Sequence, residues 1–379
     1  MRCWSILATP NRTLAILAAI VAMSACSPPQ KAQVPRRPED VRAQIVRLLP
    51  AQTSDRTGWA VDIYAAFAAL HVDPTTQNLC AALAVTEQES GLRVDPIVPG
   101  LSRIARDEID RRAGLHHIPS FVVHAALLFK SPNGKSYDER IGGVRTEQDM
   151  SRIYEDFIGS VPMGKRLFEG DNPVHTAGPM QVSVAFAEQQ AHAHPDPYAI
   201  NGSIRHEVFT RRGGVYFGIA HLLGYPASYP QPLYRFADYN AGLYASRNAA
   251  FQQATALASG IPIPLDGDLL RHDGGRDGTT EVAARTLGRS LQMSDSQIHR
   301  ALQQGDSIDF EKTALFQSTF ALAERIERRA LPRALVPRIE LVSPKITRKL
   351  TTDWYANRVN QRFLRCMALN NRVAGPALR

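Results

Sequence analysis

Glu89 is the residue of this chain best placed to do acid–base chemistry. It stands near the end of the stretch from Val72 to Pro96, which reads VDPTTQNLCAALAVTEQESGLRVDP. Four apolar residues recur there at helical spacing and form one arc: Leu79, Ala82, Leu83 and Val85. Glu89 follows Val85 by four residues and therefore falls within this arc. Burial and the negative end of the helix dipole both disfavour the charged carboxylate, so Glu89 is predicted to be a protonated general acid near neutral pH.

The helix that positions Glu89 has plausible signals at both ends. Asp73 is expected to cap its N-terminus, Pro74 suits the first helical position, and Gly91 suits a left-handed C-cap. Glu87 falls near the edge of the apolar arc. A glutamate in the last turn of a helix is also common as a solvated surface residue, and periodicity alone leaves that alternative open.

Two further motifs lie downstream. Thr176 to Ser183 reads TAGPMQVS, and residues 239–242 read YNAG. Gly178 permits a tight turn, and Gln181 offers both a hydrogen-bond donor and an acceptor. Each motif is weak by itself, since a tyrosine at a helix end is often an ordinary core residue.

Together, and in this order, ESG, GPMQ and YNAG resemble the signature of lytic transglycosylases with a goose-lysozyme-like core. The resemblance implies that Glu89 is the catalytic acid. It also implies that Tyr239 donates a hydrogen bond to Glu89, and that Asn240 holds the turn that follows. Six residues are expected to line the glycan cleft or bind substrate: Ser90, Gly178, Met180, Gln181, Tyr239 and Asn240.

The N-terminus has the pattern of a bacterial lipoprotein. Residues 1–25 are predicted to be a signal peptide, and Met23-Ser24-Ala25-Cys26 resembles a lipobox in which Cys26 is lipidated. Residues 26–40 are Pro-rich and are expected to form a tether. Ser27, rather than aspartate, follows the anchor and implies sorting to the outer membrane, facing the periplasm. An ordinary secreted protein cleaved nearby is the alternative.

The rest of the chain is expected to be mainly α. A lysozyme-like transglycosylase core is predicted over residues 41–260, with an insertion at 97–175, and residues 261–379 are predicted to be an accessory helical region. A turn at Ser131–Gly134 suggests a small β-hairpin. The expected helices are 41–49, 59–70, 101–112, 119–129, 148–158, 280–302, 310–330 and 346–369.

Composition limits the classes of partner that the protein is expected to bind. The formal net charge is +8, and the arginines are scattered rather than massed in one tract. This favours attraction to cell-wall polymer or anionic lipid and gives no sign of nucleic-acid binding. No residue cluster has the spacing of a metal site, so no cofactor is expected. Cys80 and Cys366 could form a disulfide or remain two buried thiols.

These patterns predict a peptidoglycan lytic transglycosylase. It would cleave between N-acetylmuramic acid and N-acetylglucosamine and release a 1,6-anhydromuramoyl product, because no convincing second carboxylate accompanies Glu89. A muramidase that hydrolyses the same bond is one alternative. A non-catalytic envelope lipoprotein that binds peptidoglycan or holds other proteins is the other.

Overall fold

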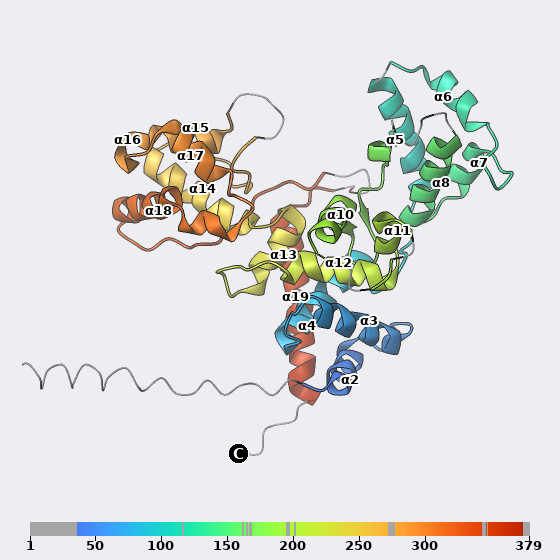
Figure 1. The fold of residues 1–379 in the computed structure, drawn as a ribbon, viewed down its shortest axis with the longest axis horizontal. Helices are drawn as coiled ribbons and strands as arrows, with labels where there is room; N and C mark the ends of the chain where they lie inside the picture. Colours follow the sequence, from blue (N-terminus) through green and yellow to red (C-terminus); the bar gives the residue numbers. More distant parts are fainter. Residues whose placement is uncertain are drawn as a thin grey trace, which may run out of the picture. The chain divides into compact units, whose positions relative to one another are not determined.

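The structure is a computed structural model. It describes residues 36–373, except 116, 161–162, 164–165, 167–168, 195–197, 201, 272–276, 343–345 and 347. The predicted signal peptide, Cys26 and residues 27–35 of the predicted tether lie outside the described residues. The described chain is mainly helical, as the sequence predicts (Figure 1).

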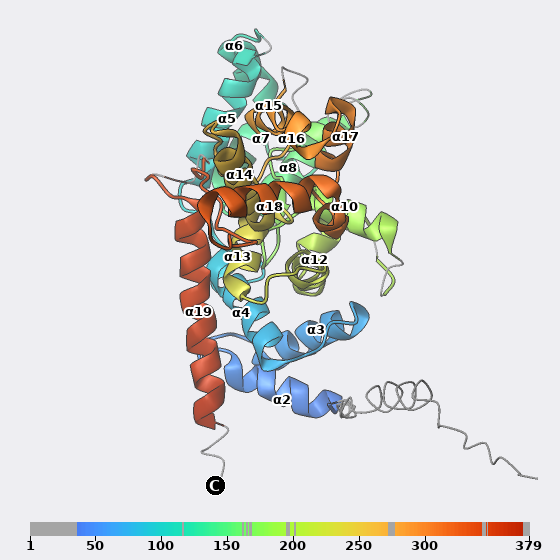
Figure 2. The same ribbon diagram turned by 90° about the vertical axis from the view of Figure 1, so that its left-hand side faces the viewer.

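The largest apolar cluster brings together helices from the beginning, middle and end of the chain. The helices around the site are α2 (Pro38–Leu48), α3 (Arg56–Ala69), α4 (Thr76–Ser90), α12 (Arg211–Leu223), α13 (Pro232–Ala241) and α19 (Thr352–Val373), and helices between residues 101 and 208 add further buried side chains to the same cluster. Figures 1 and 2 show α19 running beside both α4 and α13. The helix that carries Glu89 is therefore covered by the last helix of the chain.

α4 is the expected central helix, with one corrected boundary. Every residue from Leu79 to Thr86 is buried, which explains its almost continuous apolar sequence. Thr75 caps the N-terminus by accepting a hydrogen bond from the Asn78 N–H at 3.1 Å, so the expectation that Asp73 is the cap is wrong. Gly91 has φ of 61° and forms the predicted left-handed C-cap.

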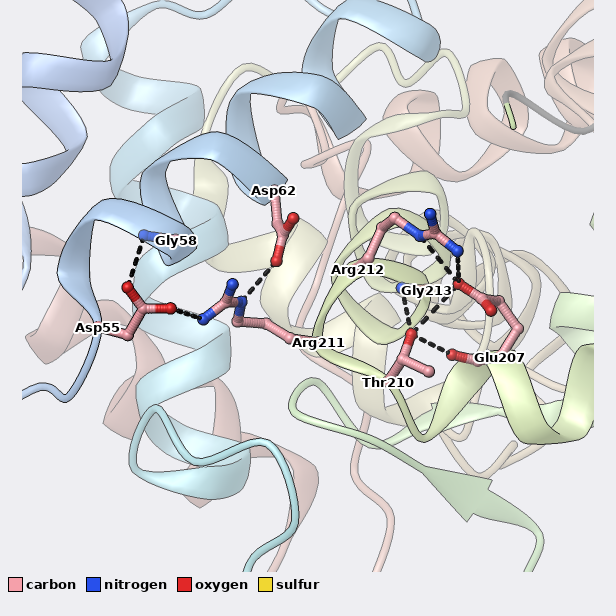
Figure 3. Close-up of polar contacts among 8 residues, drawn as sticks. All are labelled: Asp55, Gly58, Asp62, Glu207, Thr210, Arg211, Arg212 and Gly213. Atoms are coloured by element: carbon pink, nitrogen blue, oxygen red, sulfur yellow. Dashed lines mark hydrogen bonds and ion pairs between the residues drawn. The ribbon is translucent and has the colours of Figure 1, made fainter. Parts of the chain in front are cut away.

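An ion-pair network fastens α3 to α12 (Figure 3). Arg211, at the start of α12, donates to Asp55 at 2.6 Å and to Asp62 on α3. Asp55 also caps α3 through the Gly58 N–H at 3.0 Å. A Cβ on Gly58 would lie 2.4 Å from the Arg211 guanidinium, so the glycine leaves room for this pairing.

Residues 97–175 form a group of helices that pack mainly on one another. They are α5 (Leu101–Leu115), α6 (Ser120–Leu127), α7 (Tyr137–Gly143) and α8 (Glu147–Ser160), followed by the 3-10 helix η1 (Glu169–Asp171). The three helices predicted here are confirmed, and α7 is additional. Ser136 and Glu139 form a capping box at its N-terminus, and their three-residue spacing can be recognised in the sequence.

The β-structure is small and lies mostly away from the expected hairpin. β1 (Thr176–Ala177) and β2 (Val182–Ser183) pair antiparallel around the GPMQ turn, while Lys130 and Ser136 form an isolated bridge around the predicted turn. α10 (Val184–Ala193) and α11 (Ile204–Val208) then lead into α12.

Residues 245–331 build a second apolar cluster. It contains α14 (Ala245–Ser259), α15 (Thr279–Thr286), α16 (Gly288–Leu291), α17 (Asp295–Leu302), η2 (Ile308–Lys312) and α18 (Ala314–Glu327). The prediction of one helix over 280–302 is wrong, because Gln292 adopts a left-handed conformation and Ser294 starts α17 with its own capping box. The predicted helix over 310–330 begins instead with η2, and Thr313 caps α18.

The last helix begins later than predicted but belongs to the first cluster. It starts at Thr352 rather than residue 346, after Glu340 and Thr351 form an isolated bridge. Tyr355, Ala356, Val359 and Phe363 lie in the cluster around α4. Cys366 forms a disulfide with Cys80 on α4. Of the two alternatives that the sequence left open, the disulfide and not the pair of buried thiols is therefore present.

This disulfide closes a very long loop, with a sequence separation of 286. Replacing both cysteines with alanine, or reducing the wild type, should lower the free energy of unfolding by about 2–5 kcal/mol, because the unfolded chain gains freedom. Urea unfolding with and without reductant measures this. Equal stability of the oxidised wild type and the Cys80→Ala/Cys366→Ala variant would contradict it.

Candidate active site

The structure places Glu89 in contact with a tyrosine from the other end of the chain. Glu89 is half-buried in the last turn of α4, and the Tyr355 hydroxyl of α19 donates a hydrogen bond to its Oε1. Tyr355 is buried, and burial together with the negative charge of Glu89 raises the pKa of its hydroxyl well above the usual value. The hydroxyl therefore stays protonated and remains a donor to the carboxyl group.

Three contacts show how α19 lies along α4. Cys366 is bonded to Cys80, Arg362 lies 3.5 Å from Glu87, and Tyr355 contacts Glu89. Residue numbers rise along one helix as they fall along the other, so the two helices run antiparallel. Tyr355 is thus held at the Glu89 end by contacts that extend along both helices.

Asn240 fixes the start of α19. Its side-chain oxygen accepts a hydrogen bond of 3.0 Å from the hydroxyl of Thr352, which is fully buried. Tyr355 follows Thr352 by three residues and so lies one turn further along the same face. The YNAG motif, at the end of α13, therefore helps to position the residue that contacts Glu89.

Tyr239 lies within the electrostatic influence of Glu89. Its hydroxyl donates to the Met180 carbonyl at 2.8 Å, which links α13 to the GPMQ turn. Burial, and secondarily the charge of Glu89, raises the pKa of Tyr239 well above its usual value. The single hydroxyl hydrogen of Tyr239 is donated to the Met180 carbonyl, so the expectation that it is donated to Glu89 is wrong, and only the oxygen lone pairs of Tyr239 can interact with another group.

The GPMQ turn is shaped by contacts within the protein. Gly178 has φ of 72°, and a Cβ there would lie 2.0 Å from the Val208 carbonyl oxygen, so glycine is required for backbone approach. The Gln181 amide accepts from Thr176 at 3.1 Å and donates to the Gly178 carbonyl at 3.3 Å. Gly178 and Gln181 thus both stabilise the turn that presents the Met180 carbonyl.

Ser90 also forms hydrogen bonds to the backbone of its own segment. Its buried hydroxyl donates to the Thr86 carbonyl at 3.0 Å and accepts from the Arg93 N–H at 3.3 Å. Ser90 therefore stabilises the end of α4, next to Glu89.

His221 is a further buried group beside this site. It lies on α12 between two aromatic rings, with ring centroids 4.6 Å from Phe186 and 4.8 Å from Tyr239. Burial lowers its pKa from 6.5 to about 4, and its Nδ1 atom has no hydrogen-bond partner among the described residues. The ring is therefore neutral near pH 7 and packs against the ring of Tyr239.

Sequence reasoning missed Tyr355 and His221 as parts of the site. Tyr355 is separated from Glu89 by 266 positions, and the resemblance to transglycosylases does not extend to its helix. His221 falls within the apolar sequence GVYFGIAHLL, where its spacing reads as packing. A single histidine within this apolar stretch of the helix was the one signal that could have drawn attention to it.

The His221 pKa makes a prediction about acid stability. Below pH 6.5 the unfolded chain binds a proton at this histidine, but the folded chain does not until the pH approaches 4, so stability falls through this window. Between pH 7 and pH 5 the wild type should lose roughly 2 kcal/mol more unfolding free energy than His221→Phe. Urea unfolding at both pH values tests this, and parallel losses would show that His221 does not carry the effect.

The family described as "Protein of unknown function (DUF1615)" matches residues 52–369, a span that contains both Glu89 and Tyr355. "Uncharacterized protein YaiW" of Escherichia coli (strain K12) is 52% identical over 360 residues, which cover 94% of this chain and 98% of that protein. No solved structure matches. The chain therefore belongs to the DUF1615 family.

Proposed function

We propose that this protein is a peptidoglycan lytic transglycosylase with a lysozyme-like core and Glu89 as its single catalytic acid and base. The observation that carries the proposal is the hydrogen bond from Tyr355 to Glu89, at the end of a buried helix that bears the ESG motif. The two other motifs support it. Tyr239 of YNAG donates a hydrogen bond to the Met180 carbonyl of GPMQ, and the charge of Glu89 contributes to the raised pKa of Tyr239.

The proposed reaction begins with a proton transfer. Protonated Glu89 gives its proton to the glycosidic oxygen between N-acetylmuramic acid and N-acetylglucosamine, and the C–O bond of the muramoyl unit breaks. The neighbouring N-acetyl group stabilises the oxocarbenium-like centre. Glu89, now a carboxylate, takes the proton from the muramoyl C6 hydroxyl, whose oxygen closes the 1,6-anhydro ring. Tyr355 holds the carboxyl group in one orientation through both steps.

The nearest acid along α4 is poorly suited to be a second catalytic carboxylate. Glu87 lies 3.5 Å from both Arg362 and Arg365 and lines a groove of about 380 Å³ between α4 and α19. Its carboxylate is directed at these two arginines, whereas Glu89 is held by the Tyr355 hydroxyl. This favours the single-glutamate route over the two-carboxylate scheme of ordinary glycosidases.

Two alternative functions can be distinguished from this one by the products that the protein releases from peptidoglycan. A muramidase on the same core would use Glu89 to activate water and would release reducing ends. A non-catalytic lipoprotein would bind peptidoglycan, or hold other proteins, without cleaving the glycan.

We place the protein at the outer membrane, facing the periplasm, and held there by lipid on Cys26. The support is the lipobox and the Pro-rich segment that follows it. Within the described part of the chain, none of the helices has the length and apolar character needed to cross a bilayer.

Replacing Glu89 with glutamine tests the chemistry directly. The amide keeps the size of the side chain but lacks a transferable proton, so turnover should fall at least roughly 10²–10⁴-fold. Wild type incubated with purified sacculi should release 1,6-anhydromuropeptides, detected by mass analysis. A majority of reducing-end products would establish the hydrolase instead. Sacculus binding without any soluble product, unchanged in Glu89→Gln, would establish the binding protein.

Two matched variants accompany this test. Tyr355→Phe removes only the hydroxyl and should lower turnover about 10- to 100-fold through misplacement of the carboxyl group. It should also move the limb of the pH–rate profile that reports loss of the Glu89 proton to higher pH, because the hydroxyl binds the carboxylate more strongly than the neutral acid. Glu87→Gln changes an acid on the same helix that takes no part in the proposed reaction. It should stay within about threefold of wild type, because its ion pairs reach solvent and contribute little, while the disulfide still holds α19 against α4.

The anchor is tested at Cys26. The wild type should incorporate a palmitate analogue in cells and fractionate with membranes, and Cys26→Ser should abolish the labelling, because the lipid is attached to the cysteine thiol. An unlabelled wild type recovered from the soluble periplasmic fraction would refute the anchor.

A further inference from the structure

The segment from Leu115 to Phe129 exposes an unusual amount of apolar surface. Phe121 is 73% exposed and Phe129 is 71% exposed. Six of the fourteen large apolar side chains that are exposed among the described residues lie in this short segment: Leu115, Ile118, Phe121, Val122, Leu128 and Phe129. Exposed apolar side chains gathered in this way mark a surface that binds another partner or a membrane.

The fold holds these side chains outward. α6 packs on α5 and α7, with Leu127 buried and Val123 half-buried against the main cluster. Phe121 and Val122 lie on the opposite side of α6, and Leu128 and Phe129 follow directly after its last residue and extend this exposed apolar stripe. The apolar stripe is therefore left on the outside of a helix that already has its own packing face.

The charged side chains within this stretch of sequence are all basic. From Gly114 to Lys135 the sequence contains no aspartate or glutamate, whereas Lys130 and Lys135 are both exposed. Nearby acids are already paired: Glu108 with Arg111 and Arg112 at 2.7 Å, Asp110 with His124 of α6 at 3.7 Å, and Glu139 with the Ser136 N–H at 2.7 Å. A phosphate-bearing surface would complement the two lysines.

We propose that α6 and its flanking residues, 115–135, bind the surface of an anionic lipid membrane. The eight residues of α6 span about 12 Å, far too short to cross a bilayer, so the helix would lie in the interface. Its apolar stripe enters the boundary between headgroups and acyl chains, and Lys130 and Lys135 contact lipid phosphates. The inference is independent of the chemistry at Glu89.

The test uses the full chain in a Cys26→Ser background, so that no attached lipid contributes. Sedimentation with vesicles of phosphatidylethanolamine and phosphatidylglycerol should recover the protein at low salt. Phe121→Ser/Leu128→Ser/Phe129→Ser should weaken binding at least tenfold, and Lys130→Gln/Lys135→Gln should remove most of its salt dependence. Neutral phosphatidylcholine vesicles should bind more weakly.

A matched control removes three exposed apolar side chains elsewhere. Val61→Ser/Ile326→Ser/Val342→Ser changes residues that are 44%, 51% and 92% exposed, and it should bind vesicles like the parent. Thermal unfolding should be the same for both triple variants, since none of these side chains is buried. All proteins in the comparison share the same N-terminus, so differences between them report on the substituted residues.

Three outcomes would overturn the proposal. One is equal loss of binding in both triple variants, and another is equal binding to neutral and anionic vesicles. The third is a concentration-dependent dimer that binds no vesicles and is abolished by the Phe121 triple variant, which would make the stripe a contact between copies of this chain.

Discussion

The antiparallel contact between α4 and α19 is the interaction on which the candidate site depends. It combines a covalent bond at Cys80–Cys366, ion pairs at Glu87 and the hydrogen bond from Tyr355 to Glu89. α19 follows α4 by more than 260 residues, so closing this contact has a large entropic cost. The disulfide fixes that closure, and the buried faces of both helices then hold Tyr355 in register.

One polar group contacts Glu89 directly, and the others position the elements around it. Tyr355 touches the carboxyl group, whereas Asn240 anchors α19 through Thr352, and Gly178 and Gln181 shape the turn below Tyr239. A similar principle organises the second cluster, where the fully buried Arg247 donates to the carbonyls of Ser307 and Gly305 and so joins α14 to a distant loop. In both places buried polar groups are hydrogen-bonded to partners far along the chain, which are side chains around Glu89 and backbone carbonyls around Arg247.

Local sequence signals predicted many of the helices but fewer of their limits. The apolar run of α4 and its Gly91 cap were predicted because both depend on residues within one helix. The N-cap was placed at Asp73 instead of Thr75, because several residues there can cap a helix and only one does so in the folded chain. The break between α15 and α17 was missed because an amphipathic pattern can continue across a left-handed residue such as Gln292.

The sequence by itself determined that Glu89 lies on the inner side of a helix end, because helical period and capping are local properties. It also indicated that GPMQ and YNAG belong near that glutamate. Only the tertiary structure decided that Tyr355 is the hydroxyl on Glu89, that His221 is buried behind Tyr239, and that Cys80 pairs with Cys366. These choices depend on which distant helices pack together, and neither spacing nor local propensity in one sequence specifies such pairings.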